Sequence, residues 1–198
     1  MPNHTSLIHT QPRGLKDWLR VYGLYRAAFP LSEQKPFSII VGMYRRKKTD
    51  VWCLFRNGRF AGFATTINGD GAILLDYLAI KPALRGQGAG SAALQILSDI
   101  YPGRGLFTEI ESEYEPCLDQ ESRKRRKGFY LKNGYVQLNV MARVFGVKME
   151  LLGQNCQMDF SDYREFYRTH YSPRAAENVL EEPHPATIKE DSTKKRSE

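Results

Sequence analysis

The residues whose spacing most clearly suggests chemistry are the glycines of the segment 85–91. Gly86, Gly88 and Gly90 alternate with other residues, and because glycine has no Cβ atom, backbone N–H groups there can approach a ligand closely. A helix predicted over about residues 88–101 begins in the same segment. The unpaired N–H groups of its first turn and the positive end of its dipole therefore lie beside the glycines. This combination predicts a phosphate-binding loop.

Two other phosphate-binding motifs fit the segment less well. A P-loop ends in Gly-Lys-Ser/Thr, whereas Gly90 is followed directly by Ser91. A dinucleotide-binding turn carries G-x-G-x-x-G directly after its strand. The glycines here follow G-x-G-x-G some way beyond Ile80, although Glu109 and Glu111 lie at a tolerable distance for that motif. A glycine loop that only turns the chain is the purely structural alternative.

Carboxylates form a second candidate group. Side chains alternate along a strand, so Glu109, Glu111 and Glu113 share one face of the strand predicted over residues 105–113. A row of acids on one face cannot be buried without partners. A carboxylate on such a face can act as a general base that takes a proton from a reacting group. An ion pair with one of the arginines is the structural alternative for each acid.

The elements that would position these residues follow from the periodicity of the sequence. Apolar residues at helical spacing and helix end signals predict helices over residues 15–29, 32–46, 88–101, 119–133 and 160–171. Strands are predicted over residues 51–56, 59–67, 74–80, 105–113, 135–138 and 142–152, with Asn57-Gly58 as a tight hairpin turn between the first two. The order, with a strand–loop–helix–strand crossover in its middle, indicates an α/β fold with a mixed sheet.

The glycine loop and a second motif together resemble the GNAT superfamily of N-acetyltransferases. The acyl-CoA loop of the family reads Arg/Gln-x-x-Gly-x-Gly/Ala after a strand, as in Arg85-Gly86-Gln87-Gly88-Ala89-Gly90. A helix of the family ends in Phe-Tyr-x-x-x-Gly-aromatic, as in Phe129-Tyr130-Leu131-Lys132-Asn133-Gly134-Tyr135. The resemblance covers about residues 6–152. It implies the acyl-CoA N-acyltransferase fold, a central, mostly antiparallel sheet with a splayed parallel strand pair and flanking helices.

The resemblance also implies acetyl-CoA as the co-substrate. The strand before the loop would bind the pantetheine arm through its backbone, and the loop would wrap the pyrophosphate. The residues expected to bind acetyl-CoA are Leu78, Ala79, Ile80, Arg85, Gly86, Gln87, Gly88, Ala89, Gly90 and Ser91. Many relatives carry an asparagine and an alanine where this chain has Arg123 and Arg126, so the asparagine contact to CoA is not expected here.

The resemblance further implies that an acetyl group is transferred to a primary amine within a ternary complex. The amine would belong to a small cationic molecule or to a protein. Tyr130 matches the tyrosine that protonates the departing thiolate, with a core aromatic residue as the alternative. Glu111, Asp76 and Glu33 are the candidate bases near the acceptor. The alternative functions are a CoA-binding interaction protein without turnover, a dinucleotide-binding protein and a nucleic-acid-binding protein.

The composition of the chain indicates its domain organisation and its cellular environment. The 198 residues, 41% of them hydrophobic, fit one globular domain, predicted over residues 1–171, and a polar, disordered tail over residues 172–198. No apolar run is long enough to cross a membrane, and the first residues lack the pattern of a signal peptide, so no membrane partner is expected. Three scattered cysteines and four histidines near the chain ends predict no metal site and a reduced, cytoplasmic protein.

The charge of the chain is uneven. Its net charge is +7, and residues 1–171 carry +8, which is 24 Lys and Arg minus 16 Asp and Glu. A segment with this positive charge is suited to bind nucleic acid, a membrane surface or a polyanionic cofactor. Because CoA is polyanionic, no larger partner is required to explain the charge. The basic run of residues 123–127 predicts contacts with the CoA phosphates and a solvated face. It lacks the interleaved aromatic residues of a nucleic-acid site. The sequence is compatible with a homodimer.

Overall fold

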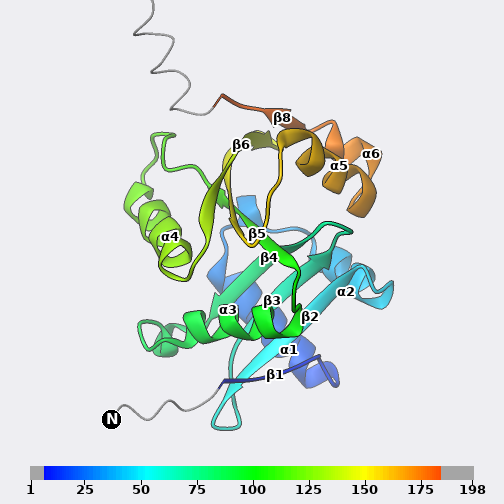
Figure 1. Cartoon of the computed structure of the whole chain (residues 1–198). Coiled ribbons are helices and arrows are strands. Elements are labelled where there is room, and N and C mark those ends of the chain that lie inside the picture. The colour runs from blue at the N-terminus through cyan, green and yellow to red at the C-terminus, as the bar shows by residue number, and fades with distance from the viewer. Residues whose placement is uncertain (1–6, 184–198) are drawn as a thin grey trace, which may run out of the picture. The chain divides into compact units, whose positions relative to one another are not determined.

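The computed structural model describes residues 7–183, apart from the Ser32 side chain, and divides into two compact units, residues 1–104 and residues 105–198 (Figure 1). Each unit has strands and helices of its own. Within residues 7–183 no helix is both long enough and apolar enough to cross a bilayer.

Over residues 7–104 the first unit is an antiparallel meander of four strands with three helices. Its strands are β1 (Leu7–Thr10), β2 (Thr49–Arg56), β3 (Arg59–Asn68) and β4 (Ala72–Ile80), and each pairs with the next. Its helices are α1 (Leu15–Ala28), α2 (Phe37–Arg45) and α3 (Ala89–Ile100), with short 3-10 turns η1 (Leu31–Glu33) and η2 (Pro82–Leu84). Asn57 and Gly58 have φ angles of 52° and 71°, which confirms the tight turn predicted between β2 and β3.

Different helices cover the two faces of this meander. On one face, Tyr25 of α1 and Ile40 of α2 belong to the same buried cluster as Cys53 of β2. On the other face, Ala93 of α3 packs with Leu54 of β2. Because side chains alternate along β2, the neighbours Cys53 and Leu54 point to opposite faces and contact different helices.

Over residues 105–183 the second unit has four strands and three helices. Its strands β5 (Gly105–Glu111), β6 (Val136–Val144), β7 (Val147–Gln154) and β8 (Val179–Glu181) are antiparallel and lie in the order β5-β7-β6-β8. Its helices are α4 (Gln120–Lys132), α5 (Phe160–His170) and α6 (Pro173–Ala176). Helix α5 packs on β5, where the rings of Phe107 and Phe166 are 5.1 Å apart.

A turn at Phe145 and Gly146 corrects one predicted strand. The pattern of the sequence predicts a single strand over residues 142–152, and this is wrong, because β6 ends at Val144 and β7 begins at Val147. Phe145 and Gly146 have φ angles of 47° and 87°. A phenylalanine rarely adopts a positive φ angle, so its presence in the sequence gives no signal of a turn.

Two further boundaries differ from the sequence prediction. Helix α2 begins at Phe37 and not at Ser32, because a proline at position 36 disfavours the helical conformation of the residue before it. Residues 173–181, predicted to lie in a disordered tail, form α6 and β8, and Val179 of β8 pairs with Val144 of β6. The part of the predicted tail over residues 184–198 lies outside the described residues. Strand β1 is an edge strand that the sequence pattern does not predict.

Candidate active site

The glycine loop connects β4 to α3. Gly86 and Gly88 have φ angles of 71° and 78°, a left-handed conformation that residues with a Cβ atom rarely adopt. A Cβ atom at either position would meet nothing within 4 Å. The requirement for glycine therefore comes from the conformation of the backbone and not from crowding.

The loop leads into the start of α3. The N-cap residue of α3 is Gly88, no side chain caps the helix, and its first turn carries no acidic residue. The first intrahelical hydrogen bond runs from the Ala92 N–H to the Gly88 carbonyl at 2.9 Å. N–H groups in a first helical turn without a capping side chain are suited to bind anionic oxygens. The loop thus has the backbone chemistry of a phosphate site.

Side chains of the loop hold it in shape. Arg85 Nε donates to the Ile80 carbonyl at 3.1 Å, and Gln87 Nε2 donates to the Ala83 carbonyl at 2.8 Å. Arg56, at the end of β2, donates from Nη1 to Gln87 Oε1 at 3.2 Å. The loop is therefore braced against both the end of β4 and the β2–β3 hairpin.

The end of β4 carries the three strand residues expected to bind the pantetheine arm, Leu78, Ala79 and Ile80. They pair with β3, where Gly62 lies opposite Ile80, and the Lys81 N–H continues the ladder by donating to the Ala61 carbonyl at 2.8 Å. A Cβ atom at Gly62 would collide with the Ala79 carbonyl oxygen. Gly62 therefore lets the two strands approach closely where the site is expected.

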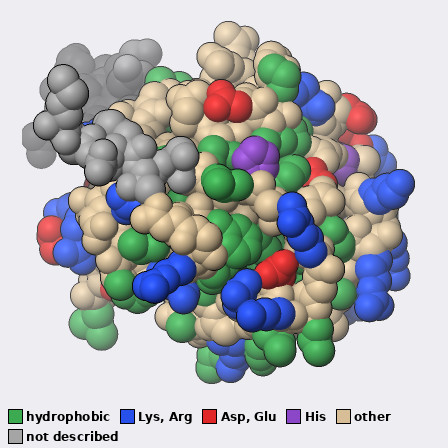
Figure 2. All heavy atoms as spheres, turned by 90° about the horizontal axis from the view of Figure 1, so that it is seen from below, with side chains coloured by type: hydrophobic (Ala, Val, Ile, Leu, Met, Phe, Trp, Pro, Cys, Tyr) green, Lys and Arg blue, Asp and Glu red, His purple; other side chains and the backbone are tan. Residues whose placement is uncertain are grey.

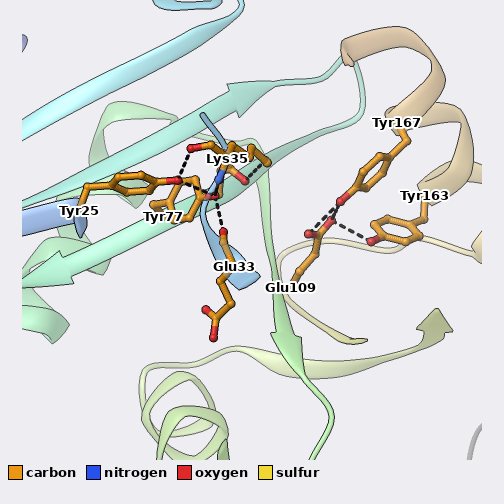
Figure 3. A network of polar contacts seen from close by, with 8 residues as sticks. Tyr25, Glu33, Lys35, Tyr77, Glu109, Tyr163 and Tyr167 are labelled. Carbon is orange, nitrogen blue, oxygen red and sulfur yellow. Dashed lines mark hydrogen bonds and ion pairs between the residues drawn. The ribbon is translucent and has the colours of Figure 1, made fainter. Parts of the chain in front are cut away.

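Two of the candidate bases belong to or contact the segment between α1 and α2 in the first unit: Glu33 is part of this segment, and Asp76 pairs with its Lys35. Asp76 Oδ1 is 2.7 Å from Lys35 Nζ, and only 9% of the Asp76 side chain is exposed. Glu33 ends the 3-10 turn η1, and its carboxylate points away from the Tyr77 ring in Figure 3. Asp76 is therefore held in an ion pair, and Glu33 lies on the chain segment between α1 and α2.

Two tyrosine hydroxyls fix the backbone of this loop. Tyr25 Oη donates to the Lys35 carbonyl and Tyr77 Oη donates to the Glu33 carbonyl, each at 2.9 Å. The Lys35 N–H in turn donates to Tyr77 Oη at 3.4 Å. Burial raises the pKa of both phenols, so they stay protonated and act as donors. The two tyrosines therefore position Glu33 and Lys35.

In the second unit, acids of and beside β5 pair with the basic run of α4. Glu111 Oε2 is 3.3 Å from Arg123 Nε, and Glu113 Oε1 is 2.7 Å from Lys127 Nζ. Lys127 also lies 2.7 Å from Glu150 Oε2, a carboxylate of β7 that is fully buried. Burial acts to lower the pKa of Lys127, but hydrogen bonds and charges of the two glutamates raise it overall. Much of the basic run therefore neutralises acids of its own unit.

Glu109, the remaining acid on this face of β5, accepts hydrogen bonds from Tyr163 and Tyr167 of α5 (Figure 3). Sequence reasoning placed Glu109 on the acidic face but missed its partners. Tyr163 and Tyr167 stand four residues apart in a predicted helix, and this spacing was the available signal that their hydroxyls share a face. Lys35, Tyr25 and Tyr77 gave no comparable signal, because their contact with one loop depends on the tertiary fold.

Tyr130, the candidate acid, lies near the end of α4 and is 7% exposed. Its ring contacts those of Phe129 and Tyr135 at centroid distances of 5.1 and 5.3 Å. Burial raises the pKa of Tyr130, while a hydrogen bond with the Thr108 side chain acts to lower it. The phenol is therefore protonated at neutral pH. Its ring packs as a core aromatic residue would, and its hydroxyl holds the proton that an acid needs.

No metal site accompanies these groups within residues 7–183, where no three His, Cys, Asp or Glu side chains are placed to hold an ion. The cysteines Cys53, Cys117 and Cys156 are all free thiols. Burial raises the pKa of Cys53 to about 12, which makes it a poor nucleophile.

Comparison with solved structures finds the same fold in several acetyltransferases. A protein described as an acetyltransferase from the GNAT family of Bacteroides thetaiotaomicron matches with a TM-score of 0.70 and 20% identity, covering 83% of this chain and 97% of its own. An aminoglycoside 6'-N-acetyltransferase complexed with coenzyme A matches with a TM-score of 0.60 and 15% identity, covering 77% of this chain and 99% of its own. The ribosomal-protein-S18-alanine N-acetyltransferase of Escherichia coli matches with a TM-score of 0.53 and 17% identity, covering 77% of this chain and 96% of its own. A comparison with curated proteins finds no match.

The family comparison agrees with the structural one. The profile of the Acetyltransferase (GNAT) family matches residues 18–135, more than half of the chain, and this segment includes both the glycine loop and the Tyr130 motif. The predicted mixed α/β fold class and the predicted enzyme class are confirmed. The chain belongs to the GNAT family of acetyltransferases.

Proposed function

We propose that this protein transfers an acetyl group from acetyl-CoA to a primary amine within a ternary complex. The observation that carries the proposal is the loop after β4, in which left-handed Gly86 and Gly88 lead into the uncapped start of α3. Such a loop suits the pyrophosphate of CoA, whose anionic oxygens match unpaired backbone N–H groups. The proposed binding residues are Leu78, Ala79, Ile80 and those of the segment 85–91.

The acceptor is proposed to be a primary amine of a small cationic molecule or of a protein. The names of two structural neighbours include both kinds of acceptor, an aminoglycoside in one case and an alanine of a ribosomal protein in the other. The acids on the loop and strands described above suit a cationic acceptor. The proposed location of this reaction is the cytoplasm, a reducing compartment that suits three cysteines present as free thiols.

The proposed chemistry is a direct attack. A carboxylate takes one proton from the acceptor ammonium, and the freed electron pair of the nitrogen attacks the thioester carbon. The backbone of Leu78 and Ala79 polarises the thioester carbonyl as its oxygen gains negative charge. The tetrahedral intermediate then loses a second nitrogen proton to solvent and expels the thiolate, which Tyr130 protonates. The carboxylate then releases its proton to solvent, and the Tyr130 phenolate takes one back. The products are an amide, CoA with its thiol restored, and one proton released to solvent.

Glu111, Asp76 and Glu33 are the proposed candidates for the base. Glu111 and Asp76 each have a cationic partner, Arg123 and Lys35 respectively, which stabilises the negative charge of the carboxylate. Glu33 lies in a loop that two tyrosine hydroxyls hold in place.

Isothermal titration calorimetry with acetyl-CoA tests the first half of this proposal. We expect one binding site per chain, and no binding by the wild-type protein would overturn the proposal. Acetylation of a panel containing spermidine, an aminoglycoside and a peptide with N-terminal alanine tests the second half. Transfer to at least one amine, followed by release of the CoA thiol, is the expected result.

A CoA-binding interaction protein without turnover is the second candidate. The ion pairs of Asp76 and Glu111 and the burial of Tyr130 favour it, because each places a proposed catalytic group in a structural role. Saturable acetyl-CoA binding with no transfer to any amine of the panel would support this function.

A further inference from the structure

Lys35 is held through both its backbone and its side chain by residues of the first unit (Figure 3). Its N–H donates to Tyr77 Oη at 3.4 Å, and its carbonyl accepts from Tyr25 Oη at 2.9 Å. Its ammonium nitrogen, Nζ, lies 2.7 Å from Asp76 Oδ1 and 5.5 Å from the centre of the Tyr77 ring. A carboxylate and an aromatic face are both groups that bind an ammonium. Helix α1 and strand β4 thus present a lysine ammonium at a defined place.

A bulge in β4 lies at the residue that pairs with this lysine. The residues on either side of Asp76 pair with adjacent residues of β3, Thr65 and Thr66, so Asp76 is an extra residue in β4. Such an extra residue bends the strand and changes the direction of its side chain. The bulge therefore accounts for a carboxylate that leaves the sheet and meets Lys35, while only 9% of the Asp76 side chain is exposed.

The ammonium of Lys35 lies along the same strand as the proposed position of the thioester. Asp76 stands two residues before Leu78, whose backbone is proposed to polarise the thioester carbonyl, and two residues of a strand span about 7 Å. The flexible four-carbon stem of a lysine can cover a span of this size by rotation. Since 30% of the Lys35 side chain is exposed, it has room to rotate. Lys35, β4 and the glycine loop all belong to the unit of residues 1–104.

We propose that Lys35 is an acceptor of the acetyl group, so that the protein acetylates itself at this side chain with Asp76 as the base. The inference rests on the proposed acetyl transfer and adds a modification site on the enzyme itself to the external acceptor. An ammonium group has no electron pair for the attack until it gives up a proton. The ion pair at 2.7 Å places the Lys35 ammonium against a carboxylate that takes this proton.

The reaction makes an amide at Lys35 Nζ. Asp76 takes one proton from the ammonium, and the electron pair that stays on Nζ attacks the thioester carbon. A bond forms between Nζ and this carbon, and the bond between the carbon and sulfur breaks. Nitrogen loses a second proton as the amide forms, and sulfur gains one proton as the thiol of CoA is restored. The products are acetylated Lys35, CoA and one proton released to solvent.

Lys81 provides a matched comparison within the same unit. It directly follows β4 and is exposed, and its Nζ lies 5.7 Å from the centre of the Phe60 ring. This aromatic contact resembles that of Lys35 with Tyr77. Among the described residues Lys81 has no acidic partner, whereas Lys35 has Asp76. Uncatalysed acetylation of an exposed lysine would therefore be seen at Lys81, and acetylation assisted by a carboxylate would be seen at Lys35.

Peptide mass spectrometry after incubation with trideuteroacetyl-CoA, without any added amine, tests the proposal. The heavy label distinguishes new acetyl groups from those acquired during expression. We expect Lys35 to be labelled at least about tenfold faster than Lys81, with a rate constant that does not depend on protein concentration. Asp76→Asn should slow the labelling of Lys35 by about 10²-fold or more, as for loss of a general base. Lys35→Arg keeps the positive charge and stays protonated, so it should lose the label at this position while the acetyl-CoA Kd stays near the wild-type value.

The outcomes distinguish this inference from the proposed function. A wild-type protein that binds no acetyl-CoA overturns both. A wild type that acetylates an amine of the panel but labels Lys35 no faster than Lys81, or at a rate constant that rises with protein concentration, overturns this inference alone. The same holds if Asp76→Asn labels Lys35 at the wild-type rate. Labelling of Lys35 without transfer to any amine of the panel supports this inference and overturns the external acceptor. If Asp76→Asn does not fold, the ratio of Lys35 to Lys81 labelling in the wild type and the Lys35→Arg variant decide it.

Discussion

At the scale of single residues, Tyr130 offers the most direct test of the proposed proton transfer to sulfur. Its phenol is buried and burial raises its pKa, so the proton is present at neutral pH. Tyr130→Phe keeps the ring and its packing on Tyr135 but removes that proton. We expect kcat to fall roughly 10²-fold or more while the acetyl-CoA Kd changes little, as measured by steady-state kinetics and calorimetry.

Tyr135→Phe is the matched control for this variant. The Tyr135 hydroxyl is buried and has no hydrogen-bond partner among the described residues. Its removal relieves an unsatisfied polar group, so kcat should stay at the wild-type value and the Tm should not fall. Wild-type turnover by Tyr130→Phe would show that Tyr130 is a core aromatic residue and that sulfur receives its proton from another source.

Gly88 allows a test of the phosphate loop. At a φ angle of 78°, a valine is strained by about 1–2 kcal/mol, and its side chain would enter the space proposed for the pyrophosphate. Gly88→Val should therefore abolish detectable acetyl-CoA binding in calorimetry and lower the Tm slightly. Gly103→Val carries similar strain, at a φ angle of 71° in the turn after α3, and should lower the Tm while keeping acetyl-CoA binding. Equal acetyl-CoA affinity in the two variants would contradict the proposed location.

The residues of the candidate site differ in how far the sequence could predict them. The left-handed conformations of Gly86 and Gly88 are local properties, and the glycine pattern predicts them directly. The alternation along β5 likewise predicts the shared face of Glu109 and Glu111. Which cation or phenol meets each acid depends on helices distant in sequence. No local pattern could therefore pair Glu111 with Arg123.

At the scale of elements, α4 is joined to β7 and to the end of β5 by a buried charge cluster. Lys127 lies 2.7 Å from both Glu113 and Glu150, and Glu150 is fully buried. Lys127→Met removes the cation and leaves Glu150 without its charge partner. Since an uncompensated buried charge is costly, we expect the free energy of unfolding to fall by about 3–5 kcal/mol, measured by urea denaturation.

Two variants check this interpretation of the charge cluster. Glu150→Gln removes the buried charge while keeping an acceptor for the Glu113 N–H, which donates to Glu150 at 2.9 Å. Added to Lys127→Met, it should recover a large part of the lost stability. Arg125→Ala, at an exposed position of the same basic run, should cost less than about 0.5 kcal/mol. If Lys127→Met and Arg125→Ala lowered the free energy of unfolding equally, the charge cluster would contribute no more stability than an exposed arginine does.

The elements themselves were predictable where the sequence carries a local signal. Asn57-Gly58 predicts its turn because both residues tolerate positive φ angles. The turn at Phe145 was missed because a phenylalanine gives no such signal. Strand β8 was missed because it is three residues long and its Val179 is buried only through pairing with β6. Tertiary contacts thus determine the elements that periodicity does not.

At the scale of the whole molecule, positive charge remains in excess after the internal ion pairs are formed. The chain carries 29 Lys and Arg against 22 Asp and Glu, and Figure 2 shows Lys and Arg side chains spread over the face that it draws, with fewer acidic ones among them. Arg123 and Lys127 are paired with Glu111 and Glu150, so they add little to this excess. The excess charge is better suited to attract a small polyanion.

This excess predicts that salt weakens the binding of CoA. Long-range attraction between a basic protein and the phosphates of CoA is screened as the Debye length shortens, so the Kd for CoA should rise as sodium chloride is added during calorimetry. Pantetheine, which has the same thiol arm without phosphates, is the matched control, and any affinity it shows should depend little on salt. A CoA Kd that does not change with salt would mean that the backbone N–H groups of the loop act alone. A salt-sensitive affinity for single-stranded RNA that exceeds the affinity for CoA would instead favour a nucleic-acid partner.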